Sequence, residues 1–230
     1  MRIVQVDDAG ARAADLRLVR DIVADGQVIC LPTDTVYGIG ADPFNSSAVD
    51  ALLTAKSRTR AMPPPVLVAN LDQARSLVAD IPTPAHALID AFWPGALTII
   101  LPAAPHLGWD LGETEGTVAL RMPDLQVTRD ILESVGPLAV TSANLTGQPP
   151  ATSIGQAYEQ LGEAVSLYLD AGPSRGGVPS TIVRWEGQRF AVVRVGAISV
   201  AQLAEVSELA GADVFPAIGT AGSSEMRAKP

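Results

Sequence analysis

The sequence is poor in cysteine, histidine, lysine and long apolar runs, and each shortage excludes a class of protein. The single cysteine, Cys30, allows no disulfide within the chain and suits a reducing cytoplasm. Two histidines and one cysteine offer no zinc-binding spacing. No apolar run approaches the roughly 18 residues that a membrane span needs, and the start "MRIVQVDDAG" lacks the apolar core of a secretory signal. We therefore expect a cytoplasmic protein that does not contact membranes.

The charge balance argues against a protein whose surface coats nucleic acid. The net charge is −9, whereas phosphate contacts need a basic face. A local basic cleft in an acidic shell remains compatible with this total. Only Lys56 and Lys229 are lysines among many arginines, so Lys56, just after a predicted helix, stands out. The chain has neither a G-x-S-x-G nucleophile elbow nor a G-x-x-x-x-G-K-[ST] phosphate loop.

The hydrophobic pattern predicts an α/β protein in which strands and helices alternate through the first half. Strand patterns cover residues 2–6, 28–31, 66–69, 97–101, 117–121, 138–140, 166–169, 181–185 and 190–195. Helical patterns cover residues 11–25, 45–55, a short segment capped by Asp72, 83–93, 127–135, 153–161 and 199–210. We expect one mixed, twisted sheet with helices on its faces over residues 1–210. Residues 211–230 are small, polar and unpatterned, which predicts a flexible C-terminal tail.

Polar turns lie beside three of the predicted strands. "PTDTVYG" follows residues 28–31, "TSAN" follows 138–140, and "PST" leads into 181–185. Loops at strand ends build the ligand sites of open α/β sheets. Four cations, Lys56, Arg58, Arg121 and Arg194, lie at the ends of predicted elements. If these ends converge, the site suits a nucleoside triphosphate, a carboxylate substrate, or both.

Each of these residues also has a purely structural interpretation. Thr35 would tighten a turn, and Lys56 and Arg58 would complement the negative end of a helix dipole. Ser142 and Asn144 would be ordinary turn residues. A single short motif does not decide between these interpretations. The order in which the motifs occur together is more specific.

Seven segments occur in a familiar order: "PTDTVYGIGADPF", "KSR", "FWPGALTIIL", "TVALRMPD", "TSANLTG", "DAGPS…GVPSTIV" and "VVRVGAIS". Over about residues 12–208 the chain resembles the YrdC-like family, the threonylcarbamoyl-AMP synthases. The resemblance implies a YrdC-like domain with a large, positively lined cavity. It also implies a nucleotidyltransferase that converts L-threonine, bicarbonate and ATP to threonylcarbamoyl-AMP and pyrophosphate. Mg²⁺ would accompany the ATP, and no metal site of the protein's own is expected.

The same resemblance implies partners and site residues. A downstream transferase complex would move the threonylcarbamoyl group to tRNA next to the anticodon, and weak binding to double-stranded RNA is a further expectation. Lys56 and Arg58 would be catalytic. The nucleotide contacts would be Arg58, Thr117, Ser142, Asn144 and Arg194, and the threonine contacts would be Thr35, Arg121, Val140 and Ser180.

Three positions depart from the family pattern. Met62, Leu67 and Pro150 stand where many relatives carry Asn, His and Ser, so those polar contacts are lost or rebuilt. Arg60 is an extra cation nearby, and we hypothesise that it compensates. The main alternative function is a non-catalytic, RNA-binding or ribosome-associated relative with the same cavity. A hydrogenase-maturation relative is disfavoured because the chain is short and has one cysteine. If the tail is not disordered, it would close over the cavity as a lid.

Overall fold

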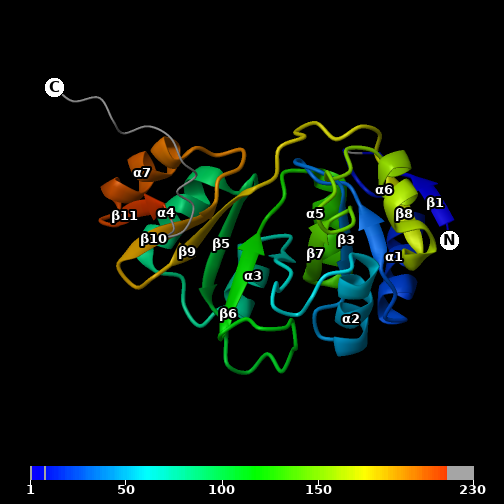
Figure 1. Cartoon of the computed structure of the whole chain (residues 1–230), viewed down its shortest axis with the longest axis horizontal. Helices are drawn as coiled ribbons and strands as arrows, with labels where there is room; N and C mark the ends of the chain where they lie inside the picture. The colour runs from blue at the N-terminus through cyan, green and yellow to red at the C-terminus, as the bar shows by residue number, and fades with distance from the viewer. Residues whose placement is uncertain (1, 8, 217–230) are drawn as a thin grey trace.

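The computed structural model describes residues 2–7 and 9–216, which form one twisted, mixed β-sheet covered by helices (Figure 1). The strands are β1 (Arg2–Gln5), β2 (Ile29–Leu31), β3 (Gly38–Ala41), β4 (Val66–Leu67), β5 (Leu97–Pro102), β6 (Thr117–Arg121), β7 (Leu138–Ser142), β8 (Leu167–Asp170), β9 (Thr181–Trp185), β10 (Arg189–Arg194) and β11 (Asp213–Pro216). The helices are α1 (Ala13–Ala24), α2 (Ser46–Ala55), α3 (Leu71–Leu77), α4 (Thr83–Phe92), α5 (Gln126–Val135), α6 (Ile154–Leu161) and α7 (Val200–Leu209).

The sheet runs in the order β1-β8-β2-β3-β7-β4-β6-β5-β9-β10-β11. The sheet contains both parallel pairs, such as β5 with β9, and antiparallel pairs, such as β3 with β7. Strands far apart in the sequence therefore become neighbours, and β7 lies between β3 and β4. The predicted fold class, a mixed α/β sheet with flanking helices, is confirmed.

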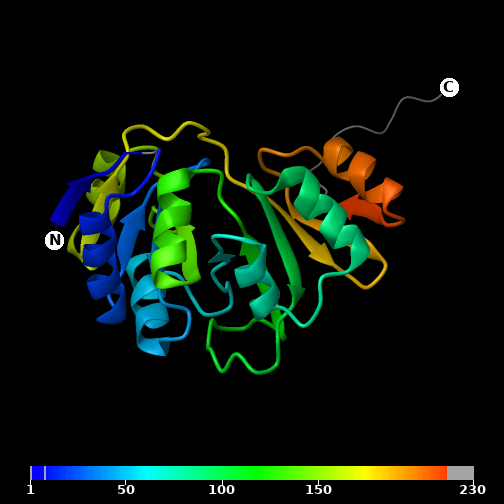
Figure 2. The same cartoon turned by 180° about the vertical axis from the view of Figure 1, so that it is seen from behind.

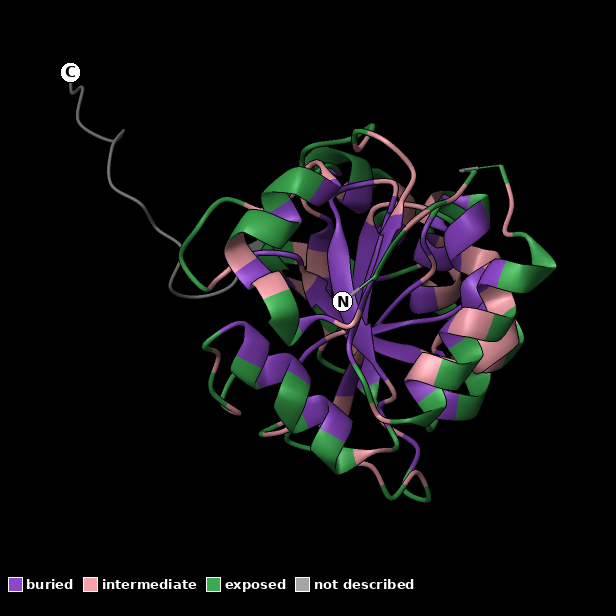
Figure 3. Ribbon diagram, turned by 90° about the vertical axis from the view of Figure 1, so that its right-hand side faces the viewer, coloured by how far each residue is buried: buried purple, intermediate pink, exposed green. Residues whose placement is uncertain are grey.

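Two apolar layers cover the half of the sheet that contains β2, β3, β7 and β8. Val19 of α1 and Ile131 of α5 pack in one layer with Leu138 of β7, and Figure 2 shows these two helices side by side. Leu52 of α2 and Ala157 of α6 belong to the layer on the other side. Buried residues accordingly concentrate in the sheet, while each helix keeps an exposed outer side (Figure 3). Because each side of this half of the sheet is covered by an apolar layer, the side chains on both faces of its strands pack into the core.

Polar caps fix the beginnings of several helices. Asn45 accepts a hydrogen bond from Ala48 N at the start of α2, and Ser153 and Ser199 cap α6 and α7. At α3 the cap is Asn70, which accepts from Gln73 N. The prediction that Asp72 caps this helix is wrong, because Asp72 lies inside the first turn.

The C-terminal boundary also differs from the prediction. Asp213–Pro216 form β11, which pairs in parallel with β10 from Arg189 to Val192. The predicted flexible tail therefore begins too early, because a strand adds to the sheet edge within it. Residues 217–230, and with them the rest of the predicted tail and its lid, lie outside the described residues. Within the described ranges no helix has the length and apolar character needed to cross a membrane.

Candidate active site

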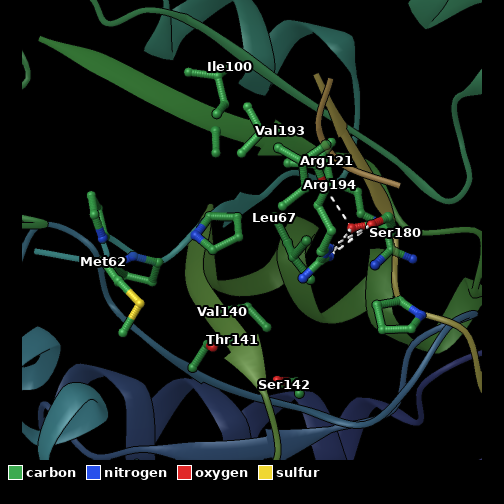
Figure 4. A pocket seen from close by; sticks show the side chains of 18 of the residues that line it. Met62, Leu67, Ile100, Arg121, Val140, Thr141, Ser142, Ser180, Val193 and Arg194 are labelled. Carbon is green, nitrogen blue, oxygen red and sulfur yellow. Dashed lines mark hydrogen bonds between the residues drawn. The ribbon is translucent and has the colours of Figure 1, made fainter. Parts of the chain in front are cut away.

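A cavity of about 590 Å³ opens on the sheet between β7 and β9 (Figure 4). This volume falls in the range of small-molecule sites. Eight of the ten predicted site residues line it: Thr35, Arg58, Thr117, Arg121, Val140, Ser142, Ser180 and Arg194. They come from loops and strands that are up to 159 residues apart in the chain, counted from Thr35 to Arg194. The strand ends singled out in the sequence do converge on one site.

The register of the sheet explains why Arg194 faces this cavity. Thr98 of β5 pairs with Ile182 of β9, and Ile182 pairs with Arg194 of β10, so all three lie in one row. The register shifts between Val192 and Arg194, as at a β-bulge. Val193 and Arg194 both line the cavity as a result. Along a regular strand, side chains alternate between the two faces of the sheet. The bulge interrupts this alternation, so the Arg194 guanidinium faces the cavity together with Val193.

Arg121 is tightly fixed by the turn "PTDT" and the loop before β5. Its guanidinium donates to Asp34 Oδ1 at 2.6 Å, to Thr35 Oγ1 at 2.9 Å and to the backbone oxygen of Gly95 at 2.9 Å. The Arg121 and Asp34 side chains are 8% and 16% exposed, so this ion pair is largely shielded from water. Arg121 and Thr35 therefore keep a fixed relative position at one end of the cavity.

The loop at 171–180 in turn fixes the "PTDT" turn. Ser174 Oγ and Gly177 N donate to the backbone oxygen of Thr35 at 2.6 and 2.8 Å. A side chain at position 176 would place its Cβ 2.5 Å from the backbone oxygen of Asp34, so only glycine permits this approach. The Gly/Pro-rich composition of "DAGPSRGGVPST" thus serves close packing against the site.

Ser180 connects β5 with β10 across the cavity. Its hydroxyl lies 2.9 Å from Thr98 Oγ1, and Arg194 donates to the Ser180 backbone oxygen at 2.8 Å and to its hydroxyl at 3.1 Å (Figure 4). Hydroxyls and guanidinium N–H groups therefore gather near Arg121. Such a set can bind the carboxylate and hydroxyl of a small polar substrate.

Arg58 supplies a cation from the opposite wall. It donates to Thr141 Oγ1 at 2.9 Å and to the Pro63 backbone oxygen at 3.3 Å, while its buried Nε has no hydrogen-bond partner among the described residues. Burial, and then the charge of Arg194, lower the pKa of Arg58. Burial, and then the charge of Arg121, lower the pKa of Arg194. These guanidiniums repel one another, so an anion bound between them would relieve the repulsion.

Lys56 and Asn144 do not lie where the sequence predicts. Neither lines the cavity, and Lys56 is only 3% exposed. The ammonium donates to the backbone oxygen of Ser142 at 2.5 Å and to both oxygens of Asn144, at 2.6 Å for the backbone and 3.0 Å for the amide. Burial, and then the charge of Arg58, lower the pKa of Lys56 to about 8. Its direct contacts are with the loop behind Ser142.

The three departures from the family pattern all line the cavity, where they add apolar surface; Figure 4 shows Met62 and Leu67. Met62 lies four residues after Arg58, Leu67 pairs with Arg121 of the neighbouring strand, and Pro150 lies eight residues after Ser142 in the chain. Arg60 does not line the cavity, because its guanidinium binds Asp50 of α2 and Asp110 of the loop before β6. The hypothesis that Arg60 replaces a lost nucleotide contact is therefore wrong for this geometry.

Sequence reasoning missed three charged residues of the cavity: Glu113, Glu115 and Arg184. Arg184 was detectable, because Ser180 was predicted to face the site and residues two and four positions further along a strand share its face. The two glutamates lie in "GETEG", a loop without periodicity, and gave no signal. Within the described ranges, no group of three or more His, Cys, Asp or Glu side chains could hold a metal ion.

The chain matches known proteins over most of its length. The profile of the Sua5/YciO/YrdC family, which carries the description "Telomere recombination", matches residues 21–196. A Mycobacterium tuberculosis protein with the provisional name threonylcarbamoyl-AMP synthase is 51% identical over 190 residues, which are 83% of this chain and 88% of that protein. A Bacillus subtilis threonylcarbamoyl-AMP synthase is 35% identical over 187 residues, 80% of this chain and 54% of that protein.

The fold also matches a solved structure, that of Pyrococcus abyssi Sua5 in complex with L-threonine. The TM-score is 0.81 at 28% sequence identity, over 93% of this chain and 62% of the other. The chain thus spans about three-fifths of the Pyrococcus protein and about half of the Bacillus protein, but nearly nine-tenths of the Mycobacterium protein. Motif order, sheet topology and these matches agree, and the chain belongs to the Sua5/YciO/YrdC family.

Proposed function

We propose that this protein is a threonylcarbamoyl-AMP synthase, an enzyme that joins L-threonine, bicarbonate and ATP into threonylcarbamoyl-AMP and releases pyrophosphate. The observation that carries this proposal is the cavity in which Arg58, Arg121 and Arg194 converge. These three guanidiniums have fewer ion pairs with carboxylates than they have charges. Of these three, only Arg121 has a carboxylate partner in the described part of the chain. A triphosphate and a carboxylate are the anions that such a site would bind.

The two ends of the cavity suit different parts of the substrates. Thr35, Ser180 and Arg121 offer two hydroxyls and a guanidinium to the same cavity, which suits the carboxylate and hydroxyl of threonine. The complex of Pyrococcus Sua5 with L-threonine supports this assignment. Arg58, Thr117, Ser142 and Arg194 also line the cavity, and we assign the nucleotide to them. Val140 would contribute backbone and apolar surface beside the threonine.

The reaction needs no covalent nucleophile from the protein. The threonine amine and bicarbonate combine to a carbamate with loss of water. A carbamate oxygen then forms a bond to the α-phosphorus of ATP as the bond to the pyrophosphate oxygen breaks. Negative charge increases on the leaving pyrophosphate, so fixed guanidiniums in a shielded cavity lower the barrier. This enzyme class is a nucleotidyltransferase.

Mg²⁺ would enter with ATP as part of the substrate. Among the cavity residues only Glu113 and Glu115 carry carboxylates, which is too few for an all-protein magnesium site. Phosphate oxygens and water would supply most ligands. In the proposed role the product passes to a transferase that modifies tRNA next to the anticodon, in keeping with a protein of the cytoplasm.

The test is pyrophosphate release from ATP by the purified protein, with and without threonine and with and without bicarbonate. The proposal requires release that depends on both. Arg58→Ala should lower the rate, whereas Arg75→Ala, on the exposed outer side of α3, should not. Release that ignores threonine, or no release from folded protein, contradicts the proposal. Salt-sensitive binding of double-stranded RNA without turnover would then favour the RNA-binding alternative.

A further inference from the structure

Arg184 of β9 lies on the cavity face of the sheet. Side chains along a strand alternate between faces, and Ser180, Ile182 and Arg184 all line the cavity. The residues between them, Thr181 and Val183, are fully buried on the other face. Arg184 directly follows the motif "GVPSTIV", and the resemblance to the family gives it no role. Its position is nonetheless as firmly set by the strand as that of Ser180.

The register places Arg184 in the next row outward from Arg194. Arg194 pairs with Ile182, whereas Arg184 pairs with Ile100 of β5. Two residues along a strand correspond to about 6.6 Å, and the four residues from Ser180 to Arg184 correspond to about 13 Å. Arg184 is therefore remote from the Ser180 and Arg121 end of the cavity. It is exposed, so it lies toward the solvent side.

The Arg184 guanidinium has no hydrogen bond, ion pair or ring contact within the described ranges. Arg189, on the next strand, pairs with Glu186 at 2.9 Å, and Arg121 pairs with Asp34. The cavity carboxylates Glu113 and Glu115 form no ion pair with Arg184. An uncompensated cation that lines a cavity already rich in guanidiniums extends the anion-binding surface toward solvent.

We propose that Arg184 binds the outer phosphates of ATP and the pyrophosphate that leaves. This inference rests on the proposed function. Threonine carboxylate and bicarbonate belong near the α-phosphorus, deep in the cavity, whereas the β- and γ-phosphates carry most of the charge and must depart to solvent. A planar guanidinium suits two phosphate oxygens at once. Arg184 is thus a nucleotide-binding residue that also holds the leaving group.

The experiment compares Arg184→Gln and Arg184→Lys with Arg189→Gln, a matched control on the same hairpin whose partner lies outside the cavity. Calorimetry measures the binding of pyrophosphate to each folded protein. Steady-state assays measure inhibition by pyrophosphate and KM for ATP and for threonine. We expect Arg184→Gln to weaken pyrophosphate binding about 10- to 100-fold, to raise KM for ATP, and to leave KM for threonine within twofold. Arg184→Lys should be intermediate, because it keeps the charge and loses the fork.

The outcomes separate this inference from the proposed function. Turnover by the wild type with unchanged pyrophosphate binding in Arg184→Gln overturns the role of Arg184 alone. Equal weakening in Arg184→Gln and Arg189→Gln also overturns it, because net charge would then explain both. A wild type without threonine-dependent turnover overturns the synthase. If the wild type shows no such turnover, calorimetry still tests the role of Arg184. A wild type that does not bind pyrophosphate contradicts that role.

Discussion

The Lys56 ammonium donates to both oxygens of Asn144, to the backbone carbonyl at 2.6 Å and to the side-chain amide at 3.0 Å. A third bond goes to the Ser142 carbonyl. The Asn144 amide nitrogen donates in turn to the backbone oxygens of Leu145 and Gln148. One lysine thus fixes the whole turn that presents Ser142 to the cavity. This relationship makes Lys56 a positioning residue whose charge acts through the loop.

Replacing Lys56 by methionine should destabilise the protein and displace this turn. Two backbone carbonyls and one amide oxygen would lose their donor in a buried site, which we expect to cost about 2–4 kcal/mol in free energy of unfolding. Urea denaturation measures this value. Arg75→Met, whose partner Asp72 is 92% exposed, is the control and should change stability by less than about 0.5 kcal/mol. Equal effects of the two substitutions would contradict the positioning role.

The lowered pKa of Lys56 predicts a pH dependence of stability. The folded value is about 8, and an unfolded lysine titrates near 10.4. Below pH 8 both states bind the proton, so the penalty for the buried charge is fully present. Between pH 8 and about 10.4 the unfolded state binds more protons, so the contribution of Lys56 to the free energy of unfolding rises with pH.

Because the chain has only two lysines, this titration can be observed directly. Carbon-13 labelling of lysine Cε gives two NMR signals, and Lys229→Ala identifies the one from Lys56. We expect that signal to titrate near pH 8. A midpoint at or above 10 would mean that the three oxygen acceptors outweigh the cost of burial, and the predicted rise in stability would be absent.

The sequence was sufficient to predict the fold class, most strands and helices, and eight of the residues that line the cavity. Strand β3 was missed because its sequence, Gly-Ile-Gly-Ala, has low strand propensity. The glycines are required by packing, since a Cβ at position 38 would lie 2.7 Å from Val140 Cγ1 of the neighbouring strand. Such a constraint exists only once β3 and β7 are paired, so no local pattern could indicate it.

The errors in the site have the same origin. Lys56 and Arg58 are two residues apart, and the sequence suggested that both face the substrate. The chain turns sharply between them, at Ser57 with φ +53°, and only Arg58 reaches the cavity. Arg60 likewise looked like a ligand contact until its partners Asp50 and Asp110 were placed beside it. Charge type was predictable, but side-chain direction depended on tertiary contacts.

Arg121→Lys should impair threonine use specifically. A lysine ammonium cannot reach Asp34, Thr35 and Gly95 together in the fork geometry of Arg121. On the proposed function, we expect KM for threonine to rise at least about tenfold, with KM for ATP changed far less. Arg129→Lys, at a partly exposed pair with Asp124 outside the cavity, is the control and should behave as the wild type. An unchanged KM for threonine would place the carboxylate elsewhere in the cavity.

Arg60 fixes the loop that forms the acidic wall of the cavity. Besides its ion pairs, its backbone oxygen accepts a hydrogen bond from Glu113 N at 2.9 Å. Gly112, with φ +105°, approaches so closely that a Cβ there would lie 2.4 Å from the same oxygen. Phe44 and Trp109 stack beside these contacts with ring centroids 5.5 Å apart. The loop at 105–116 is therefore attached to Arg60 by an ion pair, a hydrogen bond and close backbone packing, and to Phe44 by the aromatic stack.

Arg60→Met removes only the ion pairs, so we expect the loop to loosen while the fold persists. The pairs are 39–60% exposed, and their loss should cost about 1 kcal/mol or less. Hydrogen exchange at residues 105–116 should become several-fold faster, because local opening needs less free energy when the ion pair between Arg60 and Asp110 is gone. Exchange in α5, which packs against α1, serves as the internal reference, and Arg75→Met serves as the control for a lost surface pair. Unchanged exchange in the loop would mean that the Glu113 hydrogen bond, the Gly112 approach and the aromatic stack hold it without the charges, and Gly112→Ala would then be the substitution that loosens it.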